Sequence, residues 1–179
     1  TAISIGRYAT ASGGWSTVLG GSSVASQLYS TAIGQFASSD IIGKIAFGGG
    51  YKFSTTGDVQ QGKFILRSDT TNATAEALTT NNGAGSATNQ VILPNNSAFA
   101  FSGTIVARQQ ASQGTASAAW KIEGLIRREG SAGTTVLVNS ATTVLDNTPA
   151  WGMAITADVT NGGLAITVTG AASTNVRFV

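Results

Sequence analysis

A stretch near the N-terminus returns to the same pair of residues, an aliphatic residue followed by glycine, at intervals of fourteen residues. The three pairs are Ile5-Gly6, Leu19-Gly20 and Ile33-Gly34, and small residues recur three and five positions after each glycine. A fixed short period indicates that each repeat is one structural unit stacked on the next. Fourteen residues are too few for a helical hairpin, so the spacing favours a coil made of short strands and tight turns.

The repeated glycine has a structural explanation in such a coil. Glycine adopts a positive φ without penalty and lets the backbone of one coil approach the next. Because the surrounding positions carry Ser, Ala and Thr, the interior of the coil must be narrow. We expect the aliphatic residue of each pair to fill that interior.

The repeats resemble those of a known family. The segments "AISIGRYATASGG", "STVLGGSSVAS" and "STAIGQFASS" are similar to the head repeats of trimeric autotransporter adhesins of the Yersinia type, which also recur in bacteriophage tail fibres. The resemblance covers residues 1–43, with departures at Val18, Gly21 and Gln27. It implies a left-handed β-roll and three chains packed side by side. Because the chain begins at Thr1, within the repeat, we expect it to be a fragment or a processed form of a longer polypeptide.

Aromatic residues also fall into register in these repeats. One column pairs Trp15 with Tyr29, and a second pairs Tyr8 with Phe36. Such a ladder on the outside of a roll stacks either on sugar rings or on a neighbouring chain, and we favour the second because exposed aromatic ladders are rare without a partner. The expected homotrimer interface therefore consists of Ile5, Leu19, Ile33, Trp15, Tyr29, Tyr8 and Phe36.

The sequence beyond the repeats has a different character. We expect the period to break at Ile45, and residues 44–62, with three consecutive glycines, are interpreted as a junction. Residues 63–179 contain eight or nine strand candidates with two-residue alternation, among them Lys63–Ser68, Ala98–Gln109 and Ala118–Glu129. Turn signals separate them, and "TNGG" at Thr160–Gly163 predicts a two-residue hairpin loop. This pattern predicts an antiparallel β-sandwich, most simply a jelly roll. Its core is expected to include Trp120, Trp151, Phe99, Phe101, Ile122, Ile126, Met153 and Ile155.

This second region resembles the β-sandwich knobs that end many phage tail and fibre proteins. The similar segments are "FAFSGTIVARQ", "AAWKIEGLIRREG", "WGMAITADVTNGGLAITVTG" and "NVRF". The whole chain is thus predicted to be all-β, with a roll at 1–43, a junction at 44–62 and a knob at 63–179.

The residue inventory argues against catalysis. The chain has no His and no Cys, which removes Ser-His-Asp triads, thiol nucleophiles and nearly all zinc sites. Glu123 and Glu129 would lie about 20 Å apart along a strand, too far for a carboxylate pair. Asp69–Glu76 lacks the spaced acidic ligands of calcium loops. We expect no enzyme activity, cofactor or metal.

Charge and hydropathy narrow the expected partners. Only 10% of the residues are charged, the net charge is +2, and no run of Lys or Arg suggests nucleic acid. No stretch has the roughly 18 apolar residues that span a bilayer, and no signal peptide is recognisable. Contacts to a receptor are expected on two polar, glycine-rich loops, Asn81–Gln90 and Ser131–Thr135. The candidates are Asn81, Asn82, Asn89, Ser131 and Thr134.

These features favour a structural segment of a phage tail fibre or tail tip. It would sit in the virion, contact itself and other tail proteins, and attach to a host surface glycan or protein. The alternatives are the head of a bacterial trimeric adhesin on the cell surface, a capsid decoration protein and a tailspike depolymerase. The last usually needs a long β-helix with clustered acids, which this chain is too short and too poor in carboxylates to supply.

Overall fold

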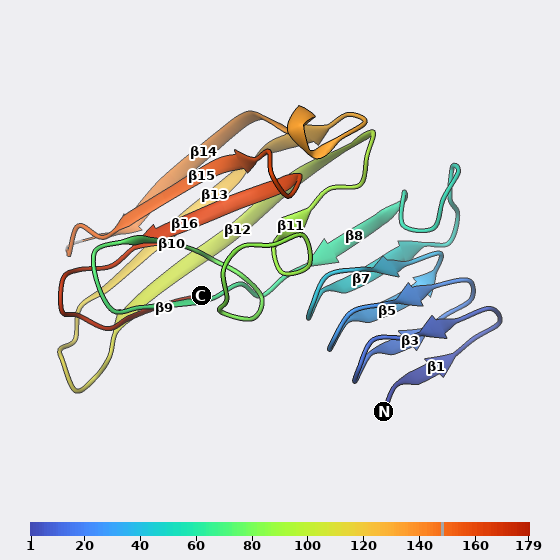
Figure 1. Ribbon diagram of the computed structural model, residues 1–179, viewed down its shortest axis with the longest axis horizontal. Coiled ribbons are helices and arrows are strands. Elements are labelled where there is room, and N and C mark those ends of the chain that lie inside the picture. The colour runs from blue at the N-terminus through green and yellow to red at the C-terminus, as the bar shows by residue number, and fades with distance from the viewer. Residues whose placement is uncertain (148) are drawn as a thin grey trace. The chain divides into compact units, whose positions relative to one another are not determined.

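The computed structural model describes residues 1–147 and 149–179. The chain divides into two compact units, Thr1–Ile65 and Leu66–Val179, and each is described by itself (Figure 1). The protein is all-β, with stacked coils in the first unit and antiparallel sheets in the second. Its one described helical element is the single 3-10 turn η1, Ala132–Thr134, so the described residues include no helix of membrane-spanning length.

The first unit is a stack of coils. Strands on one side pair in parallel with partners fourteen residues apart, such as Thr17 with Thr31, and a second parallel sheet runs along another side. The successive rungs are visible in Figure 1. The first sheet contains β1 (Ile3–Ile5), β3 (Thr17–Leu19), β5 (Thr31–Gln35) and β7 (Ile45–Gly49), and the second contains β2 (Thr10–Ala11), β4 (Val24–Ala25) and β6 (Ser38–Ser39).

The corners of the coils recur at half the sequence period. A residue with φ between 55° and 89° occurs every seven positions, so each coil has two left-handed corners. Five of the seven corners are not glycine, which is unusual because a side chain is strained in this conformation. The corner residues are Tyr8, Trp15, Ser22, Tyr29, Phe36, Gly43 and Gly50.

The interior of the stack is narrower than expected. The aliphatic residues of the repeated pairs do not fill it; Ile5 is 61% exposed and Leu19 is 43% exposed. This expectation was wrong because the neighbouring strand position points inward instead. The core consists of the fully buried side chains Val18, Ala25, Ala32, Ala37 and Ala46.

Buried serines share the interior with these small apolar residues. The hydroxyl of Ser16 donates to the carbonyl of Gly13, three residues earlier in the same coil, at 2.7 Å. Ser23 links two coils, since its Oγ donates to Gly34 O at 2.8 Å and accepts from the backbone N–H of Ala37 at 2.9 Å. Buried polar groups remain favourable only when bonded in this way, so the serines are an integral part of the stack.

The stack extends one rung beyond the expected end of the repeat. β7 pairs in parallel with β5 over five positions, including Phe47 with Ile33 and Gly48 with Gly34. The expectation that the period breaks at Ile45 was therefore wrong. "AFG" at 46–48 occupies the place of "AIG" at 32–34. The sheet ends at β8 (Gln60–Lys63), which runs antiparallel to β7.

The second unit is a sandwich of two antiparallel sheets. One sheet has the order β14-β13-β12-β17-β9, and in the other β16 pairs with β15, β10 and β11. In Figure 1, β15 and β16 run nearly along the direction of β12 and β13, and buried side chains of both sheets belong to one cluster. The strands are β9 (Ser68–Thr70), β10 (Ala75–Ala77), β11 (Val91–Ile92), β12 (Ser97–Gln109), β13 (Ser117–Arg128), β14 (Val136–Asp146), β15 (Gly152–Asp158), β16 (Gly163–Thr169) and β17 (Val176–Phe178).

One hydrophobic core joins the two sheets. The two tryptophans Trp120 and Trp151 are buried and both pack on Phe178, with ring centroids 6.4 Å and 6.1 Å away. Ile122 and Ile126 are buried as expected. The other four expected core residues are partly buried and pack against this cluster; they are Phe99, Phe101, Met153 and Ile155. Each large side chain buried contributes roughly 1.5–3 kcal/mol, which makes this core the main source of stability in the unit.

Two local predictions for this unit need correction. Residues 64–67 were expected to continue a strand from residue 63, but they lie between β8 and β9. The hairpin between β15 and β16 is present, but its loop has four residues, because Asp158 pairs with Gly163. The Asp158 side chain stabilises the longer loop by accepting from the backbone N–H groups of Thr160 and Asn161, each at 2.9 Å.

Candidate functional site

An apolar column runs along the outer face of the parallel sheet in the first unit. Ile5, Leu19, Ile33 and Phe47 follow one another in register on β1, β3, β5 and β7. Phe47 is 42% exposed and Ile33 is half-buried, so the column faces outward along all four rungs. Three of the four were expected in a trimer interface, and the structure leaves them available for such a contact.

The corner aromatics next to this sheet differ in their surroundings. Tyr8 has a cation within its own coil, since the Arg7 guanidinium lies 4.7 Å from its ring centroid and donates to its hydroxyl at 2.8 Å. Phe36 has Lys52 at 5.1 Å from its ring. Trp15 and Tyr29 have no side-chain hydrogen bond and no ring contact among the described residues, and they are 65% and 59% exposed. These two rings are therefore the strongest candidates for contact with another molecule.

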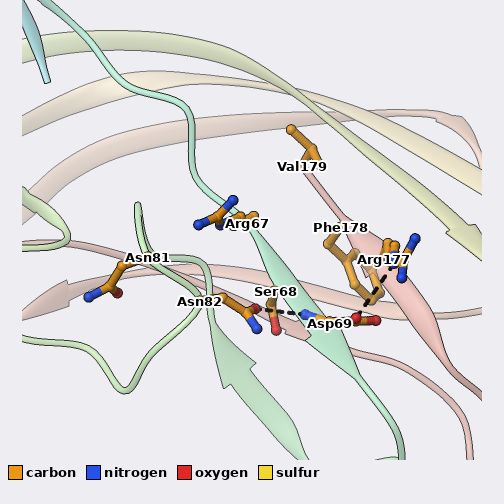
Figure 2. Close-up of a pocket in the computed structure, with 8 residues that line it drawn as sticks. All are labelled: Arg67, Ser68, Asp69, Asn81, Asn82, Arg177, Phe178 and Val179. Carbon is orange, nitrogen blue, oxygen red and sulfur yellow. Dashed lines mark hydrogen bonds and ion pairs between the residues drawn. The ribbon is translucent and has the colours of Figure 1, made fainter. Parts of the chain in front are cut away.

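The second unit has a polar hollow at the edge of its larger sheet. It measures about 500 Å³ and lies between β9, the C-terminal strand β17 and the loop that follows β10. Figure 2 shows Arg67 just before β9 and Arg177 on β17, with Asn81 and Asn82 on the loop. Two expected receptor-contact residues thus line one hollow with two arginines that the sequence analysis did not single out.

The two asparagines that line this hollow each keep a side-chain NH₂ group that no described residue engages. Asn82 Oδ1 accepts from the backbone N–H of Asp69 at 2.9 Å. Asn81 Oδ1 accepts from the N–H of Gly83 at 3.1 Å and from the side-chain amide of Asn89 at 2.9 Å. The amide oxygens are occupied by the protein, whereas neither NH₂ group has a partner among the described residues. An amide in this state recognises an acceptor.

The charged groups in the hollow are unequally paired. Arg177 Nε lies 3.5 Å from Asp69 Oδ2. Arg67 makes no side-chain hydrogen bond and no ion pair within the described part of the chain, and its side chain is exposed. Asp69 Oδ1 is buried without a partner. The hollow therefore contains one free guanidinium and one that is partly neutralised.

The remaining loop candidates lie elsewhere or serve the loop itself. Asn89 is only 3% exposed, and its amide also donates to the carbonyl of Ala84, so it holds the loop together. Ser131 and Thr134 belong to the turn between β13 and β14, where Thr134 Oγ1 donates to Ser131 O at 2.6 Å.

This turn lies far from the hollow. Val179, which lines the hollow, bonds to Val106 of β12. Ser97, at the other end of β12, pairs with Arg128 just before the turn. Val106 lies nine positions along the strand from Ser97, which corresponds to roughly 30 Å. The five loop candidates therefore do not form one site.

Two aspartates have perturbed acidity, and both serve loops. Backbone N–H bonds from Ser54, with Thr55 and Phe53, lower the pKa of Asp58. Burial raises the pKa of Asp158, but hydrogen bonds from Asn161 and Thr160 lower it by more, so the net shift is downward.

The sites described above consist of exposed apolar side chains on the first unit and of hydrogen-bond donors around the hollow of the second. Among the described residues, no three Asp or Glu side chains gather in a way that would hold a metal ion. A scan against models of known protein families finds no match to the chain. A search of curated proteins finds no relative by sequence.

Proposed function

We propose that this protein is a trimeric attachment segment of a bacteriophage tail fibre, in which the coil stack joins three chains and the sandwich contacts the host surface. The observation that carries the proposal is the uncovered apolar surface of the stack. Four aliphatic or aromatic residues in register and two bare corner rings form a surface of a kind that usually marks an interaction site.

Self-association explains why this surface repeats. A surface that recurs at every rung matches an identical neighbour at every rung, so each additional coil adds one more equivalent contact. The charge distribution agrees, because Ile5, Leu19, Ile33 and Phe47 belong to β1, β3, β5 and β7, which contain no Lys, Arg, Asp or Glu. Three copies of the sandwich would then multiply weak receptor contacts into avidity.

Light scattering on the purified protein tests the assembly. The expected mass is three times that of the 18.0 kDa chain. The double variant Trp15→Asn, Tyr29→Asn should shift the mass toward the monomer, because asparagine tolerates the left-handed corner but removes the ring. Tyr51→Asn is the matched control, since Tyr51 is 84% exposed outside both aromatic columns. A monomeric wild-type protein would refute the assembly.

Binding to whole bacterial cells tests the attachment. The labelled protein should sediment with cells of a susceptible host, and a monomeric variant should do so more weakly because avidity is lost. Incubation with the host polysaccharide should release no new reducing ends, whereas their appearance would favour a depolymerase. Wild-type protein that fails to bind any phage-susceptible cells would contradict the attachment role.

A further inference from the structure

We propose that the hollow beside β9 and β17 binds an anionic saccharide, with Arg67 as the main contact to its carboxylate or phosphate group. The inference rests on the proposed attachment function and names the class of ligand that the sandwich would recognise. It is carried by residues that line the hollow from three separate segments, which are labelled in Figure 2.

The first argument is the balance of donors and acceptors. The acceptor oxygens of Asn81 and Asn82 are occupied by protein N–H groups, and both NH₂ groups remain free. Arg67 adds a guanidinium that no described residue engages. Asp69, the one acidic side chain among the described residues that line the hollow, has Oδ1 buried and Oδ2 beside Arg177. A site that offers mainly donors is complementary to a ligand rich in acceptors.

The second argument is charge. Guanidinium groups bind carboxylates and phosphates through paired N–H bonds, which are stronger than neutral hydrogen bonds. Arg108 pairs with Arg177 across the sheet, and Arg177 pairs with Asp69 on its other side. Arg108 does not line the hollow, and its Nη1 donates to Gln109 O and Gly114 O. The hollow itself is therefore lined by two arginines and one aspartate, in a chain whose total net charge is only +2. The other nearby acid, Glu76, accepts from the hydroxyl of Ser68 at 2.8 Å.

The third argument is size and polarity. A hollow of about 500 Å³ is within the range of small-ligand sites. The free amide groups provide the additional donors that the hydroxyl and ring oxygens of a sugar accept. A carboxylated sugar and a phosphorylated sugar share the same recognition chemistry, so the probes must separate them.

The experiment is a titration of the full chain followed by NMR of the asparagine side-chain amides. The probes are galacturonic acid, glucose 6-phosphate and, as the neutral comparison, galactose. The side-chain NH₂ signals of Asn81 and Asn82 should shift saturably with at least one acidic sugar and much less with galactose. A larger effect of galacturonic acid identifies a carboxylate ligand, and a larger effect of glucose 6-phosphate identifies a phosphate ligand.

Two variants should change the affinity for the acidic sugar in opposite directions, and a third serves as the control. Arg67→Gln should weaken binding of the acidic sugar by at least about tenfold, because a charge-assisted bond is lost. Asp69→Asn should tighten it by about threefold or more, because a like charge is removed while the shape is kept. The matched control is Arg127→Gln, since Arg127 is exposed on the same sheet but pairs with Glu129 away from the hollow.

Several results would overturn the proposal. These are saturation by galactose at the same concentration, equal losses in Arg67→Gln and Arg127→Gln, and no saturable shift with any probe. The result is separable from the attachment function. If the Arg67→Gln variant binds cells as well as the wild type does, this site is rejected and the attachment function stands. If the wild type binds the acidic sugar through Arg67 but does not bind cells, the saccharide site stands and the attachment function is rejected.

Discussion

Replacing Gly20 by alanine should disrupt the coil stack, whereas the same change at Gly21 should be tolerated. Gly20 has a φ of 145°, a conformation that side chains rarely adopt. A Cβ built there would overlap the carbonyl group of Gly34 in the next coil. Gly21 has an ordinary φ, and the nearest atom to its added Cβ is Arg7 O at 3.4 Å.

The magnitude follows from these two differences. An unfavourable backbone region destabilises by roughly 1–3 kcal/mol, and forcing an extra group into a packed interior adds about 1–3 kcal/mol. Gly20→Ala should therefore lower the stability of the first unit by about 2–6 kcal/mol. Gly21→Ala should lie within about 1 kcal/mol of the wild type, because it also restricts the unfolded chain.

Hydrogen exchange measured by mass spectrometry can follow each unit separately. The backbone amides of β3 and β5 should lose protection in Gly20→Ala and keep it in Gly21→Ala, whereas amides of β12 and β13 should be unchanged in both. Equal protection of β3 and β5 in the two variants would show that the coils are not held at the close approach described here.

Other predictions concern the buried serines and the hairpin aspartate. Ser23→Ala leaves the N–H of Ala37 without its partner, so denaturant titration should show a loss of about 1–3 kcal/mol, against almost none for the exposed Ser12→Ala. Because hydrogen bonds hold the pKa of folded Asp158 below its ordinary value near 3.8, the stability that Asp158 contributes is present above that value and is lost as the pH falls through the folded pKa. The melting temperature of the wild type should therefore fall more steeply below about pH 4 than that of Asp158→Asn, and parallel curves would contradict this role.

The periodic features of the fold could be predicted from the sequence, but which side chains of each strand point to the interior could not. The glycine column gave the fourteen-residue spacing of the rungs, which the parallel register confirms. Whether Val18 or Leu19 points inward is a choice of one residue, and such a shift reverses every side chain on a strand. Nothing local distinguishes the two, because the small residues that decide the width of the interior lie on other strands.

Long alternating strands were easier to predict than loops and sites. β12 and β13 begin and end within one residue of the expected ranges, because a dozen alternating residues define one face clearly. The loop before Gly163 was misjudged, since its length depends on the side chain of Asp158. The hollow could not be foreseen, because Arg67 and Arg177 are neighbours only through the pairing of β9 with β17.

The left-handed corners at every seventh residue make the stack extensible in fixed steps. Removing residues 17–30 would bring Thr31 to the place of Thr17, with every corner and both sheets kept in line. Removing seven residues would instead exchange the two sides of all later coils and turn the apolar column away from its partners. Because neighbouring strands are about 4.8 Å apart, insertions and deletions of whole coils would set the length of such a shaft in increments of that size.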